Sequence, residues 1–420
     1  MATLNRFAAL VISASTALTT HAGQFQDLFA LAQTNDPSYL AAQHTLDSNL
    51  QILPQANSAI MPTISGSYSQ NLALDERSNS HNYGIQVALP LRLDAYYGLK
   101  IAEQSAAGAN VNFEKTHQNL IFTVIDRYIA VLKQQNQLFS TMAELAAIEQ
   151  RIEQTNQQVE LGLSTILELQ DLEANLQQLQ VGLLQVEQNL SLARADLENL
   201  TNDELPEQLG SLSTSYSATN LVQNDSLENW FRLAQIHNLD LAMNNHATQQ
   251  AFHNYQAKNV GLYPKGSVTL SQNYSAMSGE TQTLSVGITG TFYDGGLNLA
   301  QTKEAKEAWY ASQERGNATL KATQQELRRW HQAVETSQKQ IAALAKLNDA
   351  LEASLEGKNT EYQLGLRDIS DILDAEKLVF SGQRDWANAR LDLVLNQLRL
   401  KKATGILSTA DLETLDQWFQ

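Results

Sequence analysis

The chain has 420 residues, with 28 basic against 45 acidic side chains and a formal net charge of −17. This charge argues against a nucleic-acid-binding protein and favours cations near any narrow passage. Cysteine is absent, which excludes thiolate catalysis and cysteine-ligated metals.

Residues 1–22 are predicted to be a secretory signal peptide. A basic residue, Arg6, precedes an apolar run from Phe7 to Leu18, and Ala22 supplies a small residue before the cleavage point. The run is too short to span a bilayer as a helix. The alternative is a buried N-terminal helix.

Residues 23–202 are predicted to form a first structural repeat that begins with a helix over 25–60, which Pro54 kinks or ends. A β-hairpin follows over 63–93. In its second strand Tyr83, Ile85 and Val87 alternate with small or polar residues, which is the period of a strand. Strands of about ten residues can cross a membrane when tilted.

A long helical hairpin is predicted over 97–200. Its first helix carries an apolar residue at every seventh position, the spacing of a coiled coil; these residues are Val124, Val131, Leu138, Leu145, Ile152 and Val159. Gly162 interrupts the pattern, and leucines recur at the same spacing in the following helix. The two helices are therefore expected to pack antiparallel.

The same order of predicted elements then repeats after a linker or equatorial segment over 203–224. A second repeat over 225–407 holds a helix, a β-hairpin over 265–293 and a helical hairpin over 297–404, and 408–420 forms a C-terminal segment. Gly365 follows Gly162 by 203 positions, as the second heptad row follows the first. Asp294, Gly295 and Gly296 form a flexible joint between strand and helix.

The four strands are predicted to lie in a membrane. Each has one apolar face and one face of small polar residues, and tyrosines such as Tyr83 and Tyr263 stand near the strand ends, as in an interfacial girdle. The expected fold is a mixed α+β membrane protein. In this fold, a long antiparallel coiled-coil α-barrel is continuous with a transmembrane β-barrel.

Several chains must share one barrel, because four strands cannot close and an open edge in lipid leaves backbone groups unsatisfied. Two chains would give eight strands, whose interior is normally filled by side chains. Three chains would give twelve strands, which leave room for water. A homotrimer is therefore expected, with outer-membrane lipid around it.

The repeat resembles the TolC family of outer-membrane efflux and secretion channels. The resemblance rests on Leu-Gly-Leu at both helical tips, on Arg367 to Asp374 after the second tip, on the segment Ala387 to Arg390 and on the repeat spacing. It implies a trimeric exit duct of the outer membrane with a large periplasmic part. It also implies docking to a periplasmic adaptor and to an inner-membrane pump of RND, ABC or MFS type, for drug efflux or type I secretion.

Asp371 and Asp374 share a helix face just beyond the second tip, since they are three residues apart. The resemblance implies that three copies form a ring of carboxylates, which selects cations at a closed periplasmic entrance. The alternative is helix capping, with Asp368 as N-cap and Asp371 in the first turn.

The resemblance also implies links that hold the entrance shut. Arg367 and Tyr362 would tie the second helical hairpin to the first through Glu168 and Gln157. Glu168 stands where well-studied relatives carry aspartate. Its alternative role is a capping box with Thr165.

The tips themselves are Leu161, Gly162 and Leu163 in the first hairpin and Leu364, Gly365 and Leu366 in the second. The glycines allow a sharp reversal of the chain, and by resemblance the tips meet the adaptor.

No catalytic, cofactor-binding or metal-binding set is found in the sequence, and the chain is not expected to be an enzyme. A periplasmic coiled-coil adaptor or scaffold of an export complex is the alternative function.

Overall fold

The computed structural model describes residues 24–71, 80–213, 215–216, 221, 226–276 and 278–419. The signal peptide predicted over 1–22 lies outside the described residues. The elements, in chain order, are α1 Gln24–Asn35, α2 Pro37–Leu50, α3 Ile52–Ser58, β1 Thr63–Asn71, β2 Ser80–Leu91, α4 Leu93–Glu160, α5 Ile166–Thr201, α6 Leu227–His237, α7 Leu239–Asn259, β3 Lys265–Ser275, β4 Gly279–Thr289, α8 Leu297–Gln363, α9 Ile369–Thr404 and α10 Thr409–Asp416.

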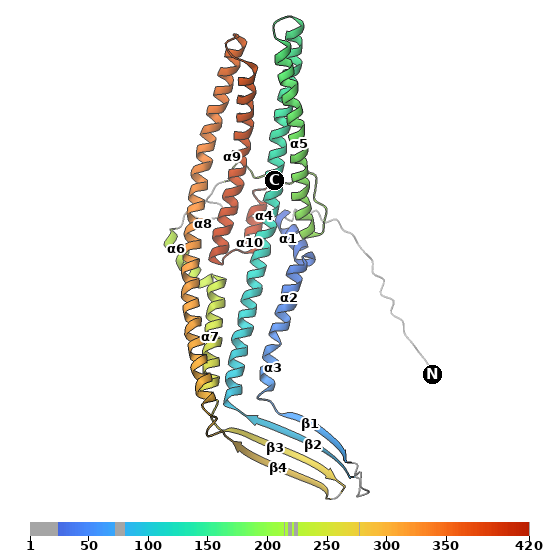
Figure 1. Ribbon diagram of the computed structural model, residues 1–420, viewed down its shortest axis with the longest axis vertical. Helices are drawn as coiled ribbons and strands as arrows, with labels where there is room; N and C mark the ends of the chain where they lie inside the picture. The colour runs from blue at the N-terminus through green and yellow to red at the C-terminus, as the bar shows by residue number, and fades with distance from the viewer. Residues whose placement is uncertain are drawn as a thin grey trace, which may run out of the picture.

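The molecule is a long helical rod with a sheet at one end and two separate helical tips at the other (Figure 1). α4 has 68 residues and α8 has 67, so each extends roughly 100 Å at about 1.5 Å per residue. α5 returns along α4, and α9 returns along α8. The predicted combination of helical hairpins and antiparallel strands is confirmed.

Several boundaries differ from the sequence prediction. The helix predicted over 25–60 is three helices, because Asp36 accepts hydrogen bonds from Ser38 N and Tyr39 N and starts α2 anew. The second break falls at Gln51, between α2 and α3. Pro54 lacks the backbone N–H that would donate to the carbonyl of Leu50, so the hydrogen-bond pattern of α2 is interrupted there. None of the described helices is both long enough and apolar enough to span a lipid bilayer.

The hairpin ends are also shorter than predicted. β2 ends at Leu91, so Leu93 opens α4 and does not close the strand. β4 ends at Thr289, and Phe292 and Tyr293 stand exposed beyond it. Asp294 then receives hydrogen bonds from Gly296 N and Asn298 N, which fixes the start of α8.

The sheet is an antiparallel meander in the order β1-β2-β3-β4. Its register places directly opposed residues on one face. On the apolar face the following residues are each more than half exposed: Ile64, Tyr68, Ile85, Leu270, Leu284, Val286 and Ile288. The other face carries Ser65, Ser67, Gln86, Ser267, Thr269, Ser271, Thr283 and Ser285.

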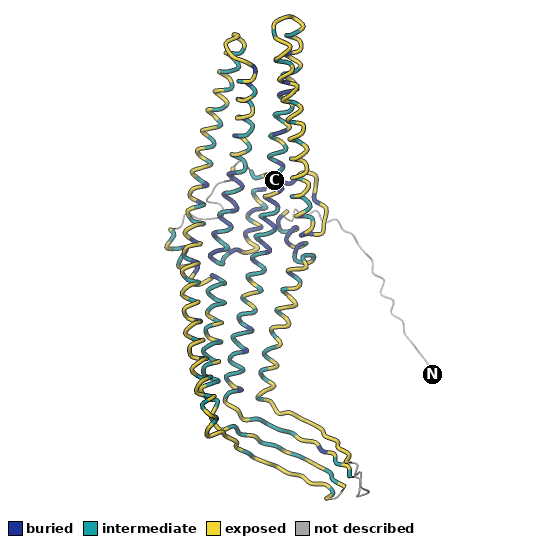
Figure 2. The backbone as a smooth tube through the Cα atoms, viewed as in Figure 1, coloured by how far each residue is buried: buried dark blue, intermediate teal, exposed yellow. Residues whose placement is uncertain are grey.

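The buried core lies at the waist of the rod, where α1, α10 and the described part of 203–224 surround α4 and α9 (Figure 2). Phe25 is fully buried, with its ring centroid 4.5 Å from that of Tyr128 and 5.0 Å from that of Phe419. Asp416 of α10 accepts hydrogen bonds from Phe25 N at 2.8 Å and from Gln26 N at 3.4 Å. The last helix therefore caps the first.

The two repeats keep their register at this waist. Asn202 and Gly405, 203 positions apart, both end a helix in the left-handed conformation. Asn35 and Asn238, also 203 apart, each donate a side-chain hydrogen bond of 2.7 Å to the end of the returning helix. The same junction between the end of a returning helix and the start of α2 or α7 therefore occurs in both repeats.

Gly405→Ala is expected to destabilise the waist strongly. The φ of Gly405 is +86°, and an added Cβ would lie 2.1 Å from the backbone oxygen of His237. Left-handed backbone alone costs a side chain about 1–2 kcal/mol, and here a rigid backbone clash adds to it. Thermal unfolding of the purified protein measures the loss.

Gly162→Ala is the matched control, because its φ is +70° but nothing lies within 4 Å of the added Cβ. An equal loss of unfolding temperature in both variants would show that the contact with His237 is unimportant.

Candidate functional site at the helical tips

The two tips are built alike. Gly162 and Gly365 both have a φ of +70°. Leu163 N donates to Gln158 O at 2.8 Å, and Leu366 N donates to Glu361 O at 3.0 Å. These are the hydrogen bonds of a helix-ending Schellman motif, so each reversal is fixed by its backbone.

The leucines beside these glycines are exposed to solvent. The exposed fractions of Leu161, Leu163, Leu364 and Leu366 lie between 69% and 77%. Large apolar side chains gathered at a tip are typical of a protein contact surface.

The two acidic residues of the predicted ring lie in the first turns of α9. Asp371 is half-exposed, and its Oδ2 atom forms an ion pair with Arg367 Nη1 at 3.4 Å, whereas Asp374 is exposed. Asp368 occupies the N-cap position but its side chain makes no capping hydrogen bond. The side chain of Asp368 therefore does not cap α9, whereas Asp371 lies in the first turn, where the helix dipole favours a negative charge.

Within one chain, the ion pairs of Arg367 are with residues of its own hairpin. Its Nε lies 2.6 Å from Glu361 Oε2, in addition to the contact with Asp371. The carboxylates hold the pKa of the Arg367 guanidinium above its usual value. A link from Arg367 to Glu168 is not present inside one chain.

Glu168 and Gln157 likewise bond within the first hairpin. Glu168 completes the capping box with Thr165, with both hydrogen bonds at 3.3 Å, as the alternative interpretation predicted. Gln157 Nε2 donates to Glu153 Oε1 at 2.9 Å on its own helix.

Tyr362 is the second residue that is predicted to tie the second hairpin to the first. Burial raises the pKa of its phenol, and the negative charge of Glu168 raises it further, while Arg151 acts in the opposite direction. Tyr362 of α8 therefore lies close enough to Glu168, at the start of α5, to be affected by its charge.

A direct link between the hairpins comes from two residues that sequence reasoning missed. Arg151 Nη2 on α4 lies 2.7 Å from Glu376 Oε1 on α9, and it donates to Asn359 Oδ1 on α8 at 3.4 Å. The side chains of Arg151 and Glu376 are only 17% and 14% exposed. The available signal was the position of Arg151 next to the heptad residue Ile152, where coiled coils place interhelical ion pairs.

The groove between α4, α5 and α9 behind this pair also holds Glu144. Burial raises the pKa of Glu144 above its ordinary value of 4.5, against the opposing charges of Lys377 and Arg384. A raised carboxyl pKa gives stability that is complete below pH 4.5 and is lost as the pH rises through the folded-state value.

Glu144→Gln is therefore expected to raise the unfolding temperature relative to wild type at pH 7 but not at pH 4. The exposed Glu149→Gln serves as control. A gain of equal size at both pH values would contradict the assignment to Glu144.

Groups of three or more side chains that could hold a metal ion are absent from the described part of the chain.

The comparisons with known proteins agree with this architecture. The family described as outer membrane efflux protein matches residues 28–203 and 230–406. The chain is 25% identical to outer membrane protein TolC of Vibrio cholerae serotype O1 over 401 residues, which covers 92% of this chain and 91% of the relative. It is 21% identical to the alkaline protease secretion protein AprF of Pseudomonas aeruginosa, over 92% of this chain and 85% of the relative.

A solved structure of CusC has the same fold, with a TM-score of 0.81 at 18% identity. The match covers 93% of this chain and 95% of that one.

Proposed function

The chain belongs to the outer membrane efflux protein family, whose channels are exit ducts for efflux or secretion, and from this premise we propose how it forms and gates such a duct. It lies in the outer membrane with a large periplasmic part, and its relatives are channel proteins and not enzymes. Membership of this family rules out the alternative function, a periplasmic adaptor or scaffold.

The duct is a homotrimer whose three four-stranded sheets close into one twelve-stranded barrel. The observation that carries this proposal is the sheet itself, since its apolar face is exposed and, among the described strands, the edge strands β1 and β4 each pair with a single neighbour. An open strand edge cannot remain unpaired in lipid. Pairing β4 of one copy with β1 of the next removes every edge, with apolar side chains toward lipid and hydroxyl groups toward water.

The helices of the three copies continue the barrel wall into the periplasm and close at the tips. Asp371 and Asp374 then contribute six carboxylates to one ring at the narrow entrance. Rings of carboxylates select cations in pores. In the assembly, Arg367 and Tyr362 of the second hairpin and Glu168 and Gln157 of the first are held near the entrance, where links between hairpins keep it shut.

Channels of this kind generally work with an adaptor and an inner-membrane pump. The proposed docking surface for the adaptor is the set of exposed leucines at the tips, where Gly162 and Gly365 fix the reversal. The pump, of RND, ABC or MFS type, supplies the energy and chooses the substrate.

Single-channel recording in planar lipid tests the ring. Wild type is expected to show a small conductance that prefers cations, and Asp371→Asn combined with Asp374→Asn is expected to lose that preference. The reversal potential across a salt gradient measures it.

Glu304→Gln combined with Glu307→Gln is the matched control, since these two exposed carboxylates have the same spacing but lie in the first turns of α8. That end of α8 adjoins the sheet and not the tips (Figure 1). An unchanged cation preference in the Asp371 and Asp374 double variant would overturn the ring.

A further inference from the structure

The waist of the rod contains a pocket that the duct function does not use, and we propose that it binds a small organic carboxylate with a flat apolar body. The pocket has a volume of about 350 Å³ and lies between α4, α7, α8 and α9 of one chain. It is called the waist pocket below. Its size is at the lower end of the range for small-molecule sites.

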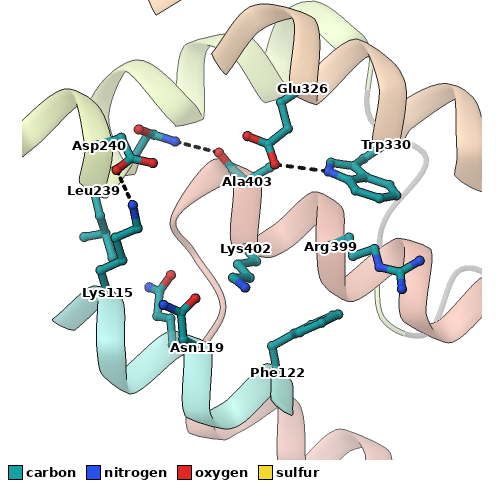
Figure 3. A pocket seen from close by; sticks show the side chains of 12 residues that line it. Lys115, Asn119, Phe122, Leu239, Asp240, Glu326, Trp330, Arg399, Lys402 and Ala403 are labelled. Carbon is teal, nitrogen blue, oxygen red and sulfur yellow. Dashed lines mark hydrogen bonds and ion pairs between the residues drawn. The ribbon is translucent and has the colours of Figure 1, made fainter. Parts of the chain in front are cut away.

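Two cations of α9 face this pocket. Lys402 lies in its centre, with Lys115, Asn119 and Phe122 of α4 on one side and α8 on the other (Figure 3). Arg399 lies one turn earlier on the same helix. Among the residues that the structure describes, the Lys402 ammonium lies over the Phe122 ring and has no hydrogen bond or ion pair.

The surroundings of Lys402 leave its charge poorly compensated. Burial lowers the pKa of Lys402, and the like charges of Lys115 and Arg399 lower it further, whereas Glu326 and Asp126 act in the opposite direction. An ammonium held in this way gains most from an anion that reaches it directly.

The acidic side chains around the pocket already have other partners. Asp240 lies 2.5 Å from Lys115 Nζ, and Glu326 accepts a 3.3 Å hydrogen bond from Trp330 Nε1. Asp126 lies 3.7 Å from Arg399. Within the described part of the chain no carboxylate therefore contacts Lys402, and a ligand can supply one.

Aromatic rings define the rest of the ligand. Lys402 Nζ lies 4.7 Å from the ring centroid of Phe122, and the Arg399 guanidinium carbon lies 5.1 Å from the ring centroid of Trp330. The planar guanidinium suits a carboxylate. Phe122 and Trp330 also line the pocket, and the apolar surface of their side chains suits a flat apolar body such as an aryl group.

The waist pocket adjoins the junction between the end of α9 and the start of α7 in the second repeat. Asn238 and Ala403 both line it, and they are joined by the 2.7 Å hydrogen bond from Asn238 Nδ2 to Ala403 O. A ligand seated there contacts all four helices at once. It stabilises the folded chain, since it binds that state only.

The test uses the purified full-length channel in detergent and benzoate as the probe. At constant ionic strength, benzoate is expected to raise the unfolding temperature by a few degrees at about 100 times its dissociation constant. Fluorine NMR of 4-fluorobenzoate measures binding directly, as line broadening that added benzoate reverses.

Lys402→Gln and Arg399→Gln are each expected to weaken binding at least tenfold, whereas the exposed Lys321→Gln on α8 should leave it unchanged. Should Lys402→Gln fail to fold, the wild-type NMR titration with Arg399→Gln still decides. The proposal is overturned if no saturable binding occurs, or if inorganic phosphate stabilises the wild type as strongly as benzoate.

Discussion

Channels with Arg151→Ala are expected to leak, with a larger resting conductance in planar lipid than wild type. The substitution leaves the largely buried Glu376 carboxylate between α4 and α9 without its 2.7 Å partner, and its buried Oε2 atom already lacks a hydrogen bond. Breaking one side of a buried pair costs about 3–5 kcal/mol. Each 1.4 kcal/mol is about a tenfold change in an equilibrium constant, so the closed arrangement of the two hairpins should lose much of its population.

The control uses another pair on the same helix interface. Lys133 Nζ lies 2.5 Å from Asp392 Oδ1, but these side chains are more exposed, and exposed pairs contribute only about 0–1 kcal/mol. Lys133→Ala should therefore leave the resting conductance close to wild type.

The double variant Arg151→Ala with Glu376→Ala should leak less than the sum of the two single changes, because no buried charge then remains alone. Equal leakage from Lys133→Ala and Arg151→Ala would contradict the role of the Arg151–Glu376 link in holding the two hairpins closed.

Val286→Arg is expected to prevent stable insertion into the outer membrane. Val286 lies in β4 on the apolar face and is 74% exposed. A charged residue on the lipid face of a barrel costs about 2–4 kcal/mol at the midplane, and every copy in the assembly carries it. The amount of protein in the outer-membrane fraction and the yield of detergent-resistant oligomer measure the effect.

Ser285→Arg is the matched control, because the neighbouring residue of the same strand points to the opposite face. It should insert nearly normally. If Ser285→Arg is the more damaging change, the two faces have been assigned the wrong way round.

The elements that sequence reasoning predicted well are those with a period. Alternation over Tyr83 to Leu91 and the sevenfold spacing from Val124 to Val159 specify strands and coiled-coil helices locally, and both are confirmed as β2 and α4. The boundaries were less accurate because they depend on caps. Asp36 restarts a helix inside a stretch that reads as one helix.

The contacts that the sequence could not reveal join distant parts of the chain. Arg151 and Glu376 are 225 positions apart, and Phe25 and Asp416 are 391 apart. No local pattern relates such residues. The tip acids and glycines were found because two copies of one repeat and a family resemblance drew attention to them, and the roles of Asp371, Asp374, Arg367 and Glu168 in the assembly stay predictions.

The most direct test is the molar mass of the purified particle, measured by light scattering with the detergent contribution subtracted. Three chains per particle are predicted, with precipitation once detergent is removed. A single-chain particle that remains monodisperse in plain buffer would contradict the account, since its exposed apolar sheet face would then need neither lipid nor a second copy.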